Sequence, residues 1–197
     1  MIGNRCRTTT CNKPKTYQTQ QMTKSKKLLI LTAFITLTIS AFGQTQENLK
    51  IIWPEDYKWK IGSNQENDNQ HMMELIPGNE TIDRWTIIGT MLSIKGVKDV
   101  PMDVAMNLMF DQAKQNAIKP TLTMIERNDT AKNAWIIFKI EAPRFKNDKN
   151  PESQLYFIIQ GTSSLYSNFV AIKEKTLSKD FIDKWAKVFK SSELVYQ

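Results

Sequence analysis

The segment Ala134-Trp-Ile-Ile-Phe-Lys-Ile-Glu141 contains the strongest fold signal in this sequence of 197 residues. Successive side chains of a β-strand point to opposite faces, so a strand here would carry Trp135 and Ile137 on one face. Its other face would carry three large apolar side chains, Ile136, Phe138 and Ile140. Large apolar side chains on both faces are typical of a central strand that is covered on both sides. The segment therefore predicts a sheet with this strand in its interior.

Further strand candidates lie before and after this segment. Alternating or β-rich patterns predict strands at 57–61, 71–76, 87–97, 121–126, 154–160 and 165–172. Polar or glycine-containing segments separate them, such as 62–70 and 161–164. Strands that follow one another in runs favour an antiparallel sheet, as in α+β proteins.

Two segments have a helical period instead. Asp99 followed by Pro101 predicts the start of a helix over 101–116. Its inward stripe is Met102, Ala105, Met106, Met109 and Ala113. Ser178 is a capping residue for a second helix over 179–190, with the apolar face Phe181, Ile182, Trp185, Val188 and Phe189. We therefore predict an α+β fold in which two main helices cover an antiparallel sheet.

Several segments resemble small exported bacterial proteins of unassigned function. The first is Gly78-Asn-Glu-Thr-Ile-Asp-Arg-Trp85-Thr86, which is similar to a GETxxNWT pattern. The others lie in the C-terminal half: Glu152-Ser-Gln-Leu155, Gln160-Gly161, Leu165-Tyr166, Phe181-Ile-Asp-Lys-Trp185 and Phe189-Lys190-Ser191. The likeness covers most of 55–195, and Asp83-Arg84 departs from the usual Asn before Trp85. It implies a PsbP/Mog-type α/β/α sandwich, and it implies no reaction, because fold and function separate readily.

Residues 22–43 have the pattern of a secretory signal peptide. Met22-Thr-Lys-Ser-Lys-Lys27 is basic, 28–39 is apolar, and Ser40-Ala41-Phe42-Gly43 offers small residues for cleavage. The apolar run is shorter than the roughly 18 residues of a membrane-spanning helix. We therefore expect cleavage before Gln44, no membrane insertion afterwards, and export to the periplasm or out of the cell.

Three parts of the chain follow from this pattern. Signal peptides begin near their basic region, so we interpret Met22 as the true start and the polar residues 1–21 as a gene-model extension. Residues 22–43 are the signal peptide, and 44–197 are expected to form a single globular domain.

Without the leader, the composition excludes several functions. Seven of the 27 Lys and Arg residues and none of the 20 Asp and Glu residues precede Gln44, which leaves 20 of each. A neutral domain lacks the basic surface that nucleic-acid binding requires. Both cysteines, Cys6 and Cys11, are also lost, so the mature domain has no disulfide, thiolate nucleophile or cysteine-ligated metal.

His71 is the only histidine, and no Gly-x-Ser-x-Gly motif accompanies it. His71-Met72-Met73 suggests Cu(I), because imidazole and thioethers are soft ligands. In a strand only His71 and Met73 share a face, and two ligands are too few. The remaining methionines are expected to fill the core: Met91, Met102, Met106, Met109 and Met124. We therefore expect no metal and no other cofactor.

The residues that weakly indicate a binding site are His71, Trp85, Tyr156 and Tyr166. Trp85 also suits a core position, and the two tyrosines also suit a cross-strand pair. We assign no catalytic residue and expect an exported, non-enzymatic domain that binds a protein partner or a small ligand. Two alternatives stay open: a small hydrolase using His71 or carboxylates such as Glu55 and Asp56, and an accessory subunit of an envelope complex.

Overall fold

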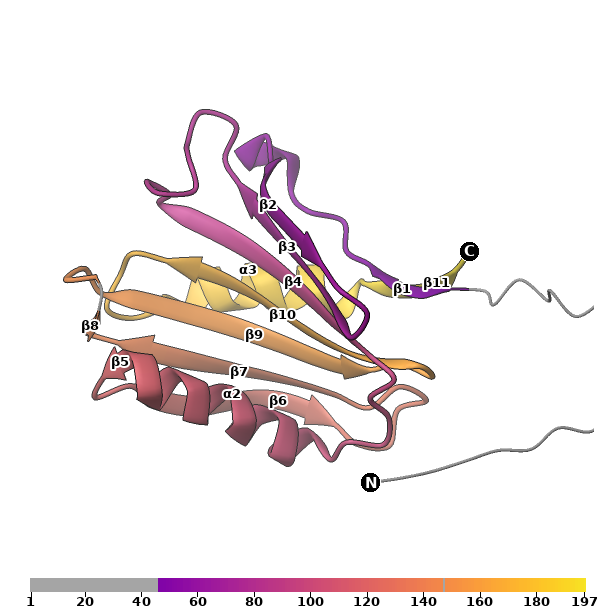
Figure 1. The fold of residues 1–197 in the computed structure, drawn as a ribbon. Helices are drawn as coiled ribbons and strands as arrows, with labels where there is room; N and C mark the ends of the chain where they lie inside the picture. Colours follow the sequence, from indigo (N-terminus) through magenta and orange to yellow (C-terminus); the bar gives the residue numbers. More distant parts are fainter. Residues whose placement is uncertain (1–45, 147) are drawn as a thin grey trace, which may run out of the picture. The chain divides into compact units, whose positions relative to one another are not determined.

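A seven-stranded antiparallel sheet forms the centre of the protein (Figure 1). The structure, a computed structural model, describes residues 46–146 and 148–197. The strand order across the sheet is β2-β3-β4-β10-β9-β7-β6. The strands span Lys60–Glu66 (β2), Gln70–Ile76 (β3), Ile87–Lys95 (β4), Thr121–Asn128 (β6), Trp135–Ala142 (β7), Glu152–Gln160 (β9) and Ser164–Ile172 (β10).

Shorter elements surround this sheet. Two two-stranded ladders pair β1 with β11 and β5 with β8, both antiparallel. The helices are a short 3-10 turn η1 and two α-helices, α2 and α3. Their bounds are Glu47–Lys50 (β1), Glu55–Tyr57 (η1), Met102–Asn116 (α2), Ala117–Ile118 (β5), Arg144–Phe145 (β8), Lys179–Lys190 (α3) and Glu193–Tyr196 (β11).

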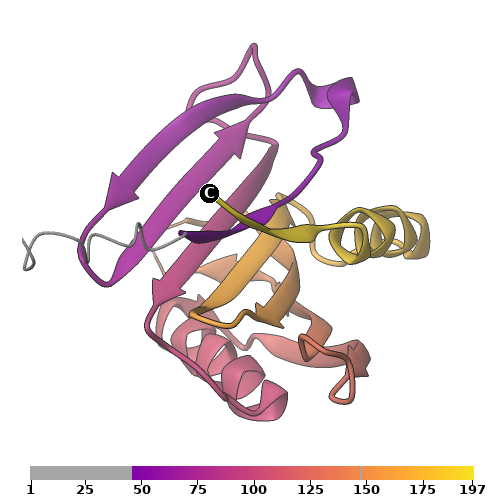
Figure 2. The same cartoon turned by 90° about the vertical axis from the view of Figure 1, so that its right-hand side faces the viewer.

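The strand predicted at 134–141 is β7, and it is an interior strand with β6 and β9 as neighbours. Its two faces contribute to two different cores. Ile136, Phe138 and Ile140 are at most 1% exposed and pack with residues of α2, whereas Ile137 packs with residues of α3. The two helices therefore lie on opposite faces of the sheet, as Figure 2 shows.

The prediction of an α/β/α sandwich with the sheet covered by two main helices was wrong. Strands account for 47% of the described residues and helices for 20%. The main helix contacts are those of α2 with β7 and β9, and those of α3 with β9. A helix is about 10–12 Å wide and strands are about 4.8 Å apart, so one helix spans roughly two strands of seven. The β2–β3 side of the sheet extends past both helices.

The bounds of both helices were predicted correctly, but the capping residue of α2 was not, because its N-cap is Pro101 and no side chain caps it. The bounds predicted at 101–116 and 179–190 agree within one residue with α2 and α3. Ser178 caps α3 as predicted, because its Oγ accepts a hydrogen bond from the backbone N–H of Phe181 at 3.2 Å. Among the described residues, no helix is long and apolar enough to cross a membrane.

The predicted signal peptide at 22–43 and residues 1–21 lie outside the described residues. The described residues form one compact unit.

Gly89 of β4 lies directly beneath the indole ring of Trp53. A Cβ atom at this position would lie 2.3 Å from Cζ3 of Trp53, far inside van der Waals contact. We expect Gly89→Ala to lower the free energy of unfolding by about 1–3 kcal/mol, since the ring must move within a packed core. Urea denaturation measures this. Gly62→Ala in β2 is the control, because its Cβ would stay 3.2 Å from the nearest atom, and an equal cost for both variants would contradict the explanation.

Candidate functional site

Three adjacent strands place polar and thioether side chains together on the face of the sheet that carries α3. Residues directly opposite each other in a ladder share a face. The β3–β4 register pairs His71 with Ser93 and Met73 with Met91, and the β4–β10 register continues this row. The shared face therefore holds His71, Met73, Met91, Ser93, Tyr166 and Asn168.

These six residues line one small pocket, here called the His71 pocket, together with Asn48 of β1 and Leu92 of β4. Its volume is about 50 Å³. That is room for a few water-sized groups. Pockets for drug-sized organic ligands begin at roughly 300 Å³. The pocket therefore suits an ion or a very small molecule.

His71 is half-buried at the rim of this pocket. Its Nε2 lies 2.6 Å from Oδ1 of Asn64 in β2. An amide oxygen only accepts, so Nε2–H donates, and the tautomer with its proton on Nε2 has its lone pair on Nδ1. Within the described residues Nδ1 has no hydrogen bond. The ring thus has a fixed tautomer and one nitrogen able to bind a ligand.

Asn168 has the most unusual environment in the pocket. Its side chain is 1% exposed, and Nδ2 has no hydrogen-bond partner in the described part of the chain. A buried amide donor left unpaired costs about 1–3 kcal/mol. Such a group in a pocket wall points to a ligand that accepts its hydrogen bond. Asn168 was not among the residues predicted from the sequence, although a lone Asn at an inward position of the apolar strand 165–172 indicates a buried polar site.

Tyr166, one of the predicted candidates, forms part of the pocket wall. It is 2% exposed, and its hydroxyl donates to Oε1 of Glu47 at 3.3 Å. Burial, and then the charge of Glu47, raise the pKa of Tyr166 to about 12. The hydroxyl therefore keeps its proton at neutral pH and has a structural role.

Glu47 ties β1 to the β9–β10 turn. Its carboxylate accepts from the backbone N–H groups of Thr162 at 2.7 Å and Ser163 at 3.1 Å, from both of their hydroxyls, and from the Tyr196 hydroxyl at 3.2 Å. Burial alone would raise the pKa of Glu47, but the hydrogen bonds from Thr162 and Ser163 outweigh it and lower the pKa to about 2. This anchor holds the neighbouring Asn48 against the pocket.

Tyr156 lies on the other face, away from the pocket. Its ring stacks on Phe138 with centroids 4.8 Å apart and an interplanar angle of 3°. Its hydroxyl donates to Oε1 of Gln154 at 2.9 Å, and burial raises its pKa. In the ladder Tyr156 is opposite Phe169, so the two tyrosines form neither a common groove nor a cross-strand pair.

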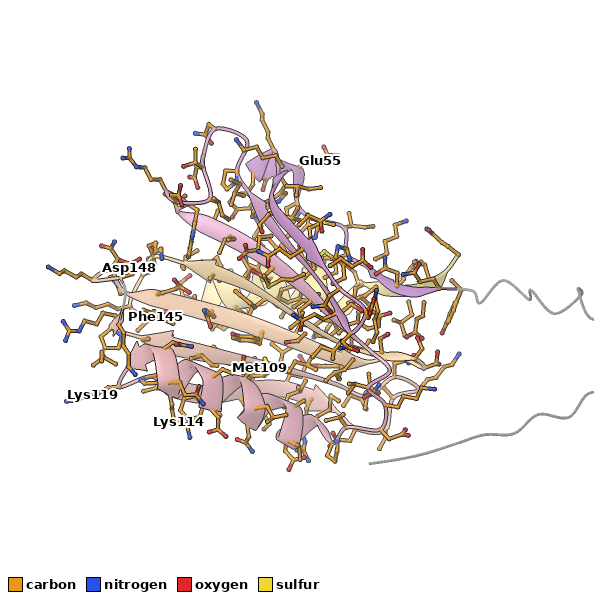
Figure 3. The ribbon with its side chains drawn as sticks, viewed as in Figure 1. Glu55, Met109, Lys114, Lys119, Phe145 and Asp148 are labelled. Atoms are coloured by element: carbon orange, nitrogen blue, oxygen red, sulfur yellow. The ribbon has the colours of Figure 1, made fainter. Side chains whose placement is uncertain are left out.

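Trp85 is also separate from the pocket. It is half-buried, and Nζ of Lys173 lies 3.8 Å from its ring centroid. Lys173 also pairs with Asp148 at 3.0 Å and Glu152 at 2.9 Å. Figure 3 shows Asp148 at the end of the sheet opposite to β1 and β11. Because Asn48 of β1 lines the His71 pocket, Trp85 belongs to a different part of the surface.

Of the two carboxylates named for hydrolysis, Glu55 and Asp56, neither lines the His71 pocket. Asp56 pairs with Lys184 at 3.1 Å, and Glu66, opposite His71 in the ladder, pairs with Lys95 at 2.7 Å. In the described part, no group of three or more His, Cys, Asp and Glu side chains is placed to hold a metal ion. His71 with two methionines is a different ligand set.

Comparison with known proteins gives no family assignment: the sequence matches no family model and no curated protein. The functional interpretation therefore rests on the residues and geometry of the His71 pocket.

Proposed function

We propose that this chain is an exported, non-enzymatic binding domain whose site is the His71 pocket. The ligand is small. The ligand itself, or a group bound to it, accepts a hydrogen bond from Nδ2 of Asn168. The observation that carries this proposal is that, among the described residues, the buried Nδ2 of Asn168 and Nδ1 of His71 line one pocket and have no hydrogen-bond partner. Most buried polar groups in natural proteins are hydrogen-bonded, and a ligand in this pocket would supply the partner that this amide lacks among the described residues.

Two features favour binding over hydrolysis. Glu47, whose carboxylate contacts the pocket residue Tyr166, has a pKa lowered to about 2 by its hydrogen bonds. It therefore stays ionised and is a poor proton donor. The Tyr166 hydroxyl donates to this carboxylate and holds its proton. A general acid or base needs a pKa near the working pH. The polar groups around the pocket therefore orient a ligand better than they transfer protons.

Export is supported by the signal-peptide pattern at 22–43 and by the resemblance to small exported proteins. An exported domain without cysteine meets small ligands under oxidising conditions and has no thiol of its own to react. Binding in the periplasm or outside the cell is consistent with its neutral charge.

Native mass spectrometry tests this proposal. The tagged chain is purified without denaturant from cells of the source organism, and its intact mass is compared with that of two pocket variants, His71→Ala and Asn168→Leu. We expect a mass increment on the wild type and a smaller bound fraction in both variants. Gln70→Ala, an exposed neighbour of His71 in β3, is the matched control and should keep the wild-type increment.

Two results would contradict the proposal. One is a wild-type chain recovered only at its unliganded mass. The other is an increment that His71→Ala and Asn168→Leu leave unchanged, since the ligand would then lie elsewhere. Recovery of a tightly bound protein instead of a small ligand would favour the envelope-complex alternative.

A further inference from the structure

We infer that the His71 pocket binds Cu(I), with the imidazole of His71 and the thioethers of Met73 and Met91 as its ligands. This inference rests on the proposed function, because it names the ligand of the same pocket.

Strand pairing brings the three donor groups together. Met73 and Met91 are directly opposite in the β3–β4 ladder, where Cβ atoms lie roughly 4.5–5.5 Å apart. His71 is two residues from Met73 and therefore on the same face. All three side chains are half-buried and line the same pocket. One face thus offers three soft donors where the local sequence offered only two.

Their surroundings differ from those of a methionine that only fills space. Met102, at 2% exposure, is enclosed by the core beneath α2. Met91 packs against the core beneath α3 and also borders the pocket, and Met73 borders the same pocket, which contains His71 and Asn168. Two thioethers therefore line one pocket with an imidazole and with an amide that has no partner among the described residues.

The hydrogen bond from His71 to Asn64 provides the usual support of a metal-binding histidine. Such ligands donate their second ring N–H to a neighbouring oxygen, which fixes the tautomer and orients the ring. Here Nε2–H donates to Asn64 Oδ1 at 2.6 Å, so Nδ1 is the nitrogen with the lone pair. Asn64 lies opposite Met73 in the β2–β3 ladder and so belongs to the same face.

The donor set selects the metal. Thioether ligands favour Cu(I), whereas calcium and magnesium require oxygen ligands and zinc sites use thiolate, imidazole or carboxylate. Among the described residues that line the pocket there is no Asp, Glu or Cys. A volume of about 50 Å³ fits one ion and a water molecule or chloride bound to it. Such a group accepts the hydrogen bond of Asn168.

A chelator competition under anaerobic, reducing conditions tests the metal. The full chain carries Cys6→Ser and Cys11→Ser, so that thiolates do not compete, and Cu(I) is titrated against a chromophoric Cu(I) chelator. We expect one Cu(I) per chain. Met73→Leu and Met91→Leu should each weaken binding at least about tenfold, the lower bound seen even for supporting groups around metal sites. Leucine conserves the volume, so the variants remain folded.

Met72→Leu is the matched control. Met72 lies between the two proposed ligands of β3 but points to the opposite face of the sheet. It should bind Cu(I) as tightly as the unsubstituted chain. In NMR spectra of protein with 13C-labelled methionine methyl groups, Cu(I) should shift the signals of Met73 and Met91 and leave that of Met72 in place.

Absence of Cu(I) binding would overturn the inference, and so would equal binding by all three variants. Neither result contradicts the proposal that the pocket binds a small ligand. That proposal is tested separately, by the mass of any bound ligand in native mass spectrometry. A wild-type increment of a different mass, with no Cu(I) uptake, would leave the pocket as a binding site for another ligand.

Discussion

Trp185→Ala is expected to lower the free energy of unfolding by about 3–5 kcal/mol, the range for removing a large aromatic side chain from a core. Trp185 of α3 is 0% exposed. Its ring is within about 6 Å, centroid to centroid, of the rings of Trp53, Tyr57, Trp59, Phe181 and Phe189. A small movement of the helix would not fill the resulting cavity, because residues of the sheet pack against the same aromatic cluster. Chemical denaturation followed by tryptophan fluorescence or circular dichroism measures the change.

Lys187→Ala is the control for Trp185. Lys187 is exposed on the same helix, two residues further on, and its replacement should change stability by no more than about 0.5 kcal/mol. If both substitutions lowered the free energy of unfolding by similar amounts, the aromatic cluster around Trp185 would not be what holds α3 on the sheet.

Glu47→Gln is expected to destabilise the protein by about 2–4 kcal/mol at neutral pH. The residue is 7% exposed, and its carboxylate accepts hydrogen bonds from two backbone N–H groups and several hydroxyls. An amide nitrogen in place of one oxygen would face donors with a donor, and each buried group left unpaired costs about 1–3 kcal/mol. Thermal or urea unfolding at neutral pH measures this loss.

The same substitution should remove a pH dependence. The folded pKa of Glu47 is about 2, lowered from an ordinary value of 4.5, so its stabilisation is complete above about pH 4.5. It is lost as the pH falls from about 4.5 towards about 2. The difference in stability between wild type and Glu47→Gln should therefore shrink over that range. Glu193→Gln, an exposed carboxylate in β11, is the control, and a difference that stays constant with pH would contradict the assignment.

The elements of this fold were largely readable from the sequence, whereas their arrangement was not. β7, α2 and α3 follow from the spacing of neighbouring apolar residues, a local property. The sandwich prediction failed because coverage depends on the number of strands that pair and on the width of one helix. A pattern of alternating residues does not state how many strands join one sheet.

The candidate site divides in the same way. The sequence placed His71 and Met73 on one face of a strand, and it singled out Tyr166. It assigned Met91 to the core, against which Met91 does pack, but it did not predict that Met91 also lines the pocket, and it did not single out Asn168. Both residues reach the pocket through ladder pairings of β4 with β3 and β10, with partners 18 and 77 positions away in the numbering. Trp85 and Tyr156 were weak candidates, and the structure places them elsewhere.

The sequence by itself determined the local conformations, the apolar faces, the neutral and cysteine-free composition after residue 43, and the two soft donors of one strand. Only the tertiary structure decided which strands are neighbours, how little of the sheet the helices cover, and that a third donor and an unpaired amide meet those two. Periodicity acts over a few residues along the chain. The register between paired strands instead depends on the free energy gained when entire faces of the sheet are buried. Pairing therefore brings together residues that lie far apart in the sequence.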